Sequence, residues 1–401
     1  MKKTAKYLSF GSLAALIVMM MAATVLERLR GTDFAFQWFY HNPVFIALWA
    51  VAAVCGLCWL ISQGVTKRFF TFLLHFTFVV ILAGALVTHL TGISGELHFR
   101  TGETADSFEM EDGSQHQLPF SLRLDEFAVE YYEGSRMPAD YRSEVTVLPE
   151  GEAHTISMNN ILKYGGYRFY QADYDEDLEG SILAVSHDPW GIGITYTGYL
   201  LLLISMIGFF FQKDSGFRRV AARLPSLPKW LRISLIVTGS ILLLGVFWLM
   251  CRRLLFQPLL PVLRSPLLVF HVVAMIISYT IFGLMALIGI TGLCVPNPKT
   301  KETLRDISLL ILYPAVFLIT FGTFLGAVWA NISWGTYWGW DPKETWALIT
   351  LLVYAFALHG GSIKAFRNPV FFHIYTIVAF ISVLVTYFGV NLLLGGMHSY
   401  M

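Results

Sequence analysis

Residues 70–91 read FTFLLHFTFVVILAGALVTHLT, and this stretch decides the fold class. It contains no Asp, Glu, Lys or Arg, and its length matches the roughly 20 apolar residues that an α-helix needs to cross a bilayer. Every backbone polar group in lipid must be satisfied internally, so such a segment predicts a membrane-spanning helix. Two ionisable side chains interrupt it, His75 near its start and His89 near its end.

Similar apolar stretches recur along the 401-residue chain. The chain is 56% hydrophobic and only 14% charged, so charge is too scarce to cover a soluble surface. The first stretch lacks a clear cleavage site, so we interpret it as a retained anchor. We predict a polytopic α-helical membrane protein with one small external β-rich domain and about nine spans, at residues 8–26, 42–62, 70–91, 191–211, 233–250, 267–293, 307–330, 345–360 and 370–391.

The basic residues predict how the chain lies in the membrane. Most Lys and Arg fall on one side when the N-terminus is placed inside and the spans alternate, and cytoplasmic loops carry this excess. We therefore expect the polar stretch on the outer side of the membrane. We take the membrane, with its lipid, to be a bacterial inner membrane and the outer side to be the periplasm. The net charge of +1 argues against a nucleic-acid partner.

The long polar stretch, residues 92–190, predicts the external domain. Short β-prone runs such as LPFSLRLDEFAVEYYEG, YRSEVTVL and YRFYQADYD alternate apolar and polar residues between Gly, Asn and Asp. A sandwich or barrel of about 100 residues fits this pattern. Residues 212–232 form a basic inner linker, which divides the chain into residues 1–91, the external domain and the span 191–211 on one side and residues 233–401 on the other.

The sequence WGTYWGWDPKETWAL at 334–348, here called the tryptophan strip, carries the strongest functional signal. Its tryptophans are Trp334, Trp338, Trp340 and Trp346, and Asp341, Lys343 and Glu344 lie among them. Tryptophans gather at membrane interfaces as an aromatic belt, which explains part of the strip. The interleaved charges favour a ligand site, for haem or for quinone.

Histidines in membrane segments are expensive and suggest function. His271 and His398 share the predicted outer level with the strip, whereas His75 and His359 share the inner level. Two facing imidazoles hold a b-type haem. The tryptophans would supply flat walls, and Lys343 with Arg252, Arg253 and Arg264 would meet the haem propionates. We interpret His89 and His373 as ordinary interfacial residues, and Cys55 and Cys58 as helix residues or a redox pair.

The strip resembles the tryptophan-rich WWD signature of the haem-handling proteins of cytochrome c biogenesis. SPLLVFHVVAMIISY, WALITLLVYAFALHG and YFGVNLLLGGMHSY are similar to other parts of the CcsA (ResC) branch, so residues 233–401 resemble a five-span CcsA-like domain. FLLHFTFVVILAGALV and the external β-stretch resemble the partner CcsB (ResB), which makes residues 1–91 a three-span ResB-like part. The chain therefore resembles a compact fusion of both System II subunits.

This resemblance implies a set of site residues. His271 and His398 fall where the family places its external haem ligands, and His75 and His359 fall where it places its membrane-embedded ones. The positions on the signature itself are Trp334, Trp338, Trp340 and Asp341.

The resemblance implies a holocytochrome c synthase of the haem lyase type. Such a protein exports haem b and joins its vinyl groups by thioether bonds to the CxxCH motif of apocytochrome c. A thioredoxin-like thiol reductant is then an expected partner, because the substrate thiols must be reduced. We expect no residue to act as a nucleophile. Two alternatives are a haem transporter or chaperone without ligation, and an electron-transfer subunit with two b-haems.

Overall fold

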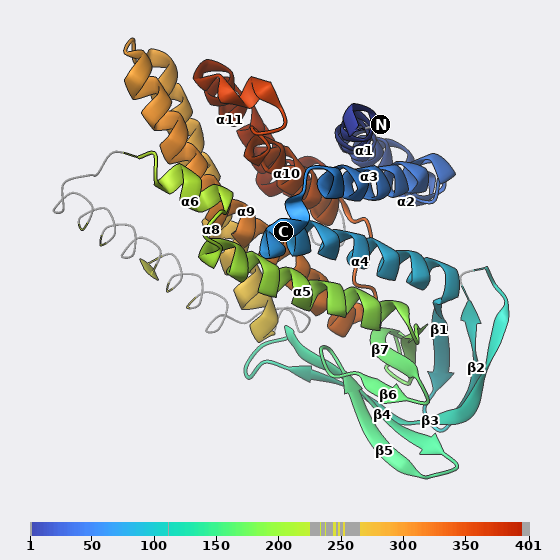
Figure 1. The fold of residues 1–401 in the computed structure, drawn as a ribbon. Helices are drawn as coiled ribbons and strands as arrows, with labels where there is room; N and C mark the ends of the chain where they lie inside the picture. Colours follow the sequence, from blue (N-terminus) through green and yellow to red (C-terminus); the bar gives the residue numbers. More distant parts are fainter. Residues whose placement is uncertain are drawn as a thin grey trace.

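Helices and one antiparallel sheet make up the computed structural model of the protein (Figure 1). It describes residues 2–110, 112–224 and 265–394, together with a few single positions between 225 and 264. The helices form a bundle, and the sheet lies beyond the end where α4 leads into β1 (Figure 1). We call this the sheet end of the bundle and the opposite end the far end.

The described helices confirm the predicted fold class. Seven helical stretches are long and apolar enough to cross a membrane, which makes the chain a multi-pass membrane protein. The helices and helical turns are α1 (Lys2–Arg30), α2 (Thr32–Ala35), η1 (Phe36–Tyr40), α3 (Pro43–Ser62), η2 (Val65–Lys67), α4 (Phe69–Thr91), α5 (Gly191–Phe211), α6 (Gly216–Ala221), α8 (Pro266–Cys294), α9 (Pro298–Trp334), α10 (Pro342–Leu358), η4 (Lys364–Arg367), α11 (Pro369–Leu384) and η5 (Val385–Leu394).

Three predicted spans differ from the observed helices. Those at 8–26 and 307–330 lie within the longer α1 and α9, because both helices continue past their apolar parts into polar turns. Asn297 caps the polar start of α9 by accepting a hydrogen bond from the Lys299 N–H. The span at 345–360 corresponds to α10, which has 17 residues. The predicted span at 233–250 lies outside the described residues.

The β-rich region forms one eight-stranded antiparallel sheet in the order β5-β4-β3-β2-β1-β8-β7-β6. The two ends of the sheet approach each other, since β5 contacts both β6 and β7, and the apolar side chains point into a common core. The strands are β1 (Ile93–Arg100), β2 (Thr104–Met110), β3 (Gln115–Tyr131), β4 (Pro138–Leu148), β5 (Glu152–Ser157), β6 (Leu162–Tyr164), β7 (Tyr167–Tyr174) and β8 (Gly180–His187).

A β-bulge accounts for the mixed pattern of the longest strand, β3. Leu122 and Leu124 alternate inward, but the next buried side chain is Phe127, three positions on. The pairing of β3 with β4 shifts register between Leu124 and Glu126. A bulge adds one residue to one strand. The apolar side chains after it therefore fall on odd-numbered instead of even-numbered positions and still point into the core.

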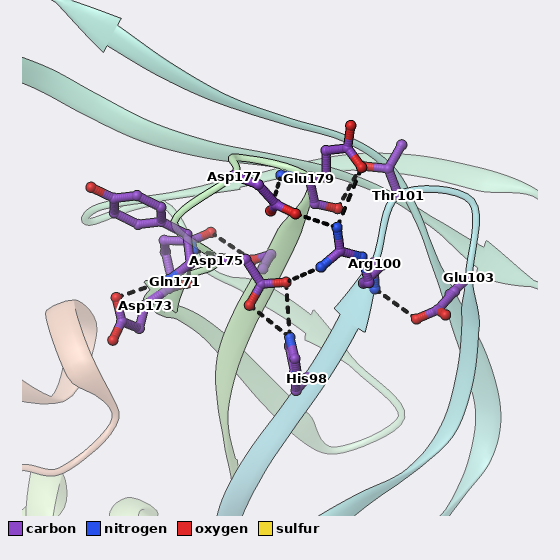
Figure 2. A network of polar contacts seen from close by, with 11 residues as sticks. His98, Arg100, Thr101, Glu103, Gln171, Asp173, Asp175, Asp177 and Glu179 are labelled. Carbon is purple, nitrogen blue, oxygen red and sulfur yellow. Dashed lines mark hydrogen bonds and ion pairs between the residues drawn. The ribbon is translucent and has the colours of Figure 1, made fainter.

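An ion-pair network joins β1 to the turn between β7 and β8 (Figure 2). The Arg100 guanidinium pairs with Asp175, Asp177 and Glu179, and Nε2 of His98 lies 3.0 Å from Oδ1 of Asp175. The Arg100 hydrogen bond holds the pKa of Asp177 below its usual range. These contacts pair three of the five carboxylates in the acidic sequence DYDEDLE, so these three brace the sheet.

Helices α4 and α5 pack closely because each places a glycine at their contact. An added Cβ at Gly84 would lie 2.7 Å from the backbone nitrogen of Thr195, and one at Gly198 would lie 3.2 Å from the backbone nitrogen of Ile81. Small residues let membrane helices approach in this way, where lipid provides no hydrophobic drive. The two helices lie side by side and carry the sheet at their shared end (Figure 1).

We expect Gly84→Ala to lower the free energy of unfolding by about 1–3 kcal/mol, because the methyl group meets backbone that cannot move aside. Denaturant titration of the purified protein in detergent measures this loss. Gly11→Ala in α1 is the matched control, since no atom lies within 4 Å of its added Cβ. Equal stability of the two variants would contradict the close packing of α4 and α5.

Candidate functional site

The tryptophan strip is the loop between α9 and α10, together with the first turns of α10. α9 ends at Gly335 in the left-handed conformation (φ 85°), a position where an added Cβ would lie 2.7 Å from the Tyr170 ring. Residues 336–341 are non-helical, and α10 then begins at Pro342. The loop is therefore pinned between the membrane bundle and strand β7.

The charged residues of the strip form the start of α10. Asp341 is the N-cap, and its Oδ1 accepts a hydrogen bond of 2.9 Å from the Lys343 N–H. Pro342 occupies the first helical position, and Oε2 of Glu344 accepts 2.9 Å from the Gly339 N–H. Nζ of Lys343 donates 2.8 Å to Oδ1 of Asn391 in η5. The charges among the tryptophans thus have local structural roles, which sequence reasoning missed although D-P-x-E is a helix-start signal.

The tryptophans of the strip have different surroundings. Trp334 meets Trp329 edge to face, with ring centroids 4.8 Å apart, and Trp338 meets Trp340 at 5.7 Å. Trp346 is 6% exposed and donates from Nε1 to Oγ1 of Thr24 in α1, at 3.0 Å. Trp346 therefore faces the N-terminal helix, whereas Trp334 packs against Trp329 within α9.

Trp340 holds an unusual backbone conformation. Its φ of 53° is rare for a bulky side chain and costs on the order of 1–3 kcal/mol. Tyr40 stacks on the indole at 4.8 Å with an interplanar angle of 12°, and Phe45 meets it edge-on at 5.0 Å. The carbonyl of Trp340 accepts a hydrogen bond from the Thr345 hydroxyl. The N-terminal residues thus hold a strained tryptophan in one orientation.

Asn331, one turn before the end of α9, joins three parts of the chain. Its Oδ1 accepts hydrogen bonds of 2.9 Å from both Arg168 in β7 and Tyr196 in α5, and its Nδ2 donates 3.0 Å to the Gly335 carbonyl. The residue is 1% exposed. Sequence reasoning missed it, although an amide inside an apolar helix is itself a signal of a polar contact.

A second hydrogen-bonded chain links the strip to α4. Tyr337 donates from its hydroxyl to Oγ1 of Thr88, at 2.9 Å, and Thr88 donates to Oδ2 of Asp188, at 2.6 Å. Asp188 accepts from the Gly191 N–H at the start of α5. The strip is therefore fixed to both helices that carry the sheet.

The structure brings His75 and His359 together near the far end. Their ring centroids are 6.0 Å apart, with planes at 81°. Each Nδ1 lies 2.7 Å from a helix carbonyl, that of Thr71 or of Ala355. A carbonyl only accepts, so each Nδ1 carries the proton and the neutral ring has its lone pair on Nε2, the arrangement of a metal-binding imidazole.

His271 lies in the early turns of α8, against α9. Its Nδ1 is 2.7 Å from the Gly322 carbonyl, and an added Cβ at Gly326 would lie 2.6 Å from the same nitrogen. Gly326 is eight residues before Trp334, or about 12 Å along the helix. His271 thus belongs to the sheet-end half of the bundle. Its predicted partner, His398, lies outside the described residues, as do Arg253 and Arg264.

The remaining membrane histidines differ from each other. His373 is fully buried, with Nε2 3.1 Å from the Lys301 carbonyl. His89 is exposed and faces His41, with ring centroids 5.9 Å apart. His373 is the fifth residue of α11 and packs against Gly292 of α8 and the start of α9, so its interpretation as an ordinary interfacial residue stays a prediction.

Two protein families match this chain. The model of the Cytochrome C assembly protein family matches residues 194–398, about half of the chain, and that of the ResB-like family matches residues 60–189. Neither match includes residues 1–59, the segment that contains Thr24 and Tyr40.

Individual relatives share parts of the sequence. Protein NrfI of Wolinella succinogenes is 38% identical over 177 residues, which are 41% of this chain and 20% of that protein. Cytochrome c biogenesis protein CcsA of Chlamydomonas reinhardtii is 41% identical over 155 residues, covering 36% of this chain and 43% of that protein. CcsA of Gloeothece citriformis is 50% identical over 101 residues, which are 25% of this chain and 30% of that protein. The chain thus spans less than two thirds of each of these relatives.

We expect Asn331→Ala to lower the free energy of unfolding by about 1–3 kcal/mol. The change removes the buried acceptor of the Arg168 hydrogen bond and the donor to the Gly335 carbonyl. Denaturant titration measures the loss, and hydrogen exchange should rise in residues 335–341. In a double-mutant cycle, Arg168→Gln should couple to Asn331→Ala by about 0.5 kcal/mol or more.

Arg142→Gln is the control for these variants. Arg142 pairs with Glu130 and Glu144 on the sheet, but all three side chains are at least 36% exposed. Exposed pairs contribute roughly 0–1 kcal/mol, so this change should leave the strip unaffected. Additive effects of Arg168→Gln and Asn331→Ala would contradict a direct link between β7 and the strip.

Proposed function

We propose, since the chain belongs to the cytochrome c assembly protein family, that it moves haem b across the membrane and attaches it to apocytochrome c. The protein acts in a bacterial inner membrane, with the sheet and the tryptophan strip on the periplasmic side. It is a holocytochrome c synthase that fuses a ResB-like half to a CcsA-like half. Haem is its substrate and cargo.

The arrangement of His75 and His359 carries this proposal. The two imidazoles come from different halves of the chain, α4 and the C-cap of α10, and their centroids are 6.0 Å apart. A metal ion bound to two imidazole nitrogens at about 2 Å each separates the ring centroids by about 6 Å. The common Nδ1–H to carbonyl bonds leave each Nε2 with its lone pair, so this pair suits a haem iron within the membrane.

The second haem position is at the strip. His271 and His398 are its axial ligands, and Trp334, Trp338 and Trp340 provide flat apolar walls. Lys343 meets the propionates, while Asp341 fixes the start of α10 and Trp346 anchors it to α1. The haem moves from the pair of His75 and His359 to the position at the strip, in the direction of the sheet.

Attachment needs positioning rather than a protein nucleophile. Each cysteine S–H of the CxxCH motif adds across one vinyl C=C, so the sulfur bonds to the ring-side vinyl carbon and the proton goes to the outer carbon. The addition neither oxidises nor reduces the pair, but a disulfide cannot react, so a thioredoxin-like reductant keeps the substrate thiols reduced. Fixing haem and substrate in one geometry supplies the rate enhancement.

We expect His75→Gly and His359→Gly each to remove at least about 90% of the bis-histidine haem signal at the far end, because a single axial ligand remains. Absorption spectra of the protein purified from haem-replete cells measure this. Imidazole added to either variant should restore the signal, which a merely structural role would not allow. Covalent haem on a coexpressed apocytochrome c, detected after denaturation, reports the ligation step.

His154→Gly is the control, since this imidazole is on β5 and pairs with Glu152. A haem signal indifferent to both membrane variants would overturn the ligand assignment. Bound haem without any covalent product would favour a transporter or chaperone. Two retained haems that exchange electrons with quinone would favour an electron-transfer subunit.

We expect Gly326→Ala to shift the haem spectrum in the same direction as His271→Gly, and to lower ligation by roughly tenfold. The added methyl group would displace the His271 ring, which lies 2.6 Å from that Cβ position. Gly283→Ala in α8 is the control, because its Cβ would make an ordinary contact of 3.4 Å with Phe380. Normal ligation by the Gly326 variant would argue against His271 as a ligand.

A further inference from the structure

His41 and His89 differ from every other histidine that the structure describes. Eight of the ten described imidazoles place a ring nitrogen against a protein oxygen, and only these two rings have no such partner within the described residues. The paired rings and their partners are His75 with Thr71, His98 with Asp175, His116 with Tyr167, His154 with Glu152, His187 with Gly166, His271 with Gly322, His359 with Ala355 and His373 with Lys301.

These two unpaired rings face each other. Their centroids are 5.9 Å apart and their planes are tilted by 46°. His41 follows η1, where its backbone N–H donates to the Phe36 carbonyl and its ring lies edge-on to Phe36. His89 is in the last turn of α4. Both side chains are exposed, and they lie at the sheet end of the bundle.

The residues beside the pair hold it in place. Tyr40, next to His41, stacks on Trp340, and Thr88, next to His89, is bonded to Tyr337 and Asp188. Both neighbours are thus tied to the tryptophan strip from separate elements. The two imidazoles are therefore kept close by contacts other than their own, as in a preformed site.

We propose that His41 and His89 bind one divalent transition-metal ion, Cu²⁺ more tightly than Zn²⁺. Imidazole suits both ions, and Cu²⁺ is the stronger binder of the two at nitrogen sites. Metal–nitrogen bonds of about 2 Å allow two rings at this separation to share one ion after small side-chain rotations. Water fills the other positions, since no described group of three or more His, Cys, Asp or Glu can hold a metal.

This site is separate from the proposed haem positions. Haem needs flat apolar walls, whereas both of these rings lie exposed at the protein surface. An ion here would join the corner between η1 and α3 to the end of α4. It would therefore clamp the segment between η1 and α3 to α4, beside the strip.

Titration of the purified full-length protein with Cu²⁺ tests the proposal. We expect one copper ion whose electron paramagnetic resonance spectrum shows coupling to two imidazole nitrogens, and a competition with Zn²⁺ that copper wins. His41→Ala and His89→Ala should each weaken this binding by about tenfold or more and remove one nitrogen coupling. His98→Ala is the matched control, because its exposed ring is paired with Asp175.

The outcomes separate this site from haem handling. Copper affinity and nitrogen coupling that stay the same in both single variants would overturn the proposal. A loss of the bound-haem spectrum in these variants, without a change in copper binding, would assign the pair to haem iron and also overturn it. Normal haem binding and ligation together with lost copper binding is the expected result.

Discussion

The loop between α9 and α10 interrupts the helical hydrogen-bond pattern, so its buried backbone groups must find partners elsewhere in the protein. An unpaired buried backbone group costs about 1–3 kcal/mol. Nearby side chains supply these partners. The backbone groups and the side chains that pair with them are the Gly335 carbonyl with Asn331, the Gly339 N–H with Glu344, the Trp340 carbonyl with Thr345 and the Lys343 N–H with Asp341. The polar residues among the tryptophans therefore make the aromatic loop possible.

The rigidity of this loop explains why a strained tryptophan persists. Trp340 has φ 53°, and such a conformation survives only where the surroundings determine it on several sides. Tyr40 and Phe45 from the N-terminal segment and the Thr345 hydroxyl supply those contacts. A platform that must present one face of a flat ligand benefits from a fixed ring, because less freedom is lost on binding.

Contacts between distant parts of the chain recur at both ends of the bundle. Near the far end α4 and α10 meet through His75 and His359, and at the sheet end Arg168 and Tyr196 converge on Asn331. Helix α1 adds Thr24, which receives the Trp346 N–H. The proposed haem positions therefore lie where the ResB-like and CcsA-like parts touch. Fusion in one chain keeps the two parts at high effective concentration.

The sequence by itself determined the membrane helices, the β-rich region and the placement of His75 and His359 at one end of the bundle, because these follow from local hydrophobic pattern and from position along a helix. It also marked the strip, through tryptophans and charges in one short run. It did not reveal that Asp341 caps α10 and that Glu344 accepts a hydrogen bond from the loop. Nor did it reveal that Asn331, Thr88 and Tyr40 hold the strip. Only tertiary structure decides such contacts, since their partners are up to hundreds of residues apart and pair through packing. The facing of His41 and His89 is of the same kind, because it depends on how η1 and α4 are fixed to one loop.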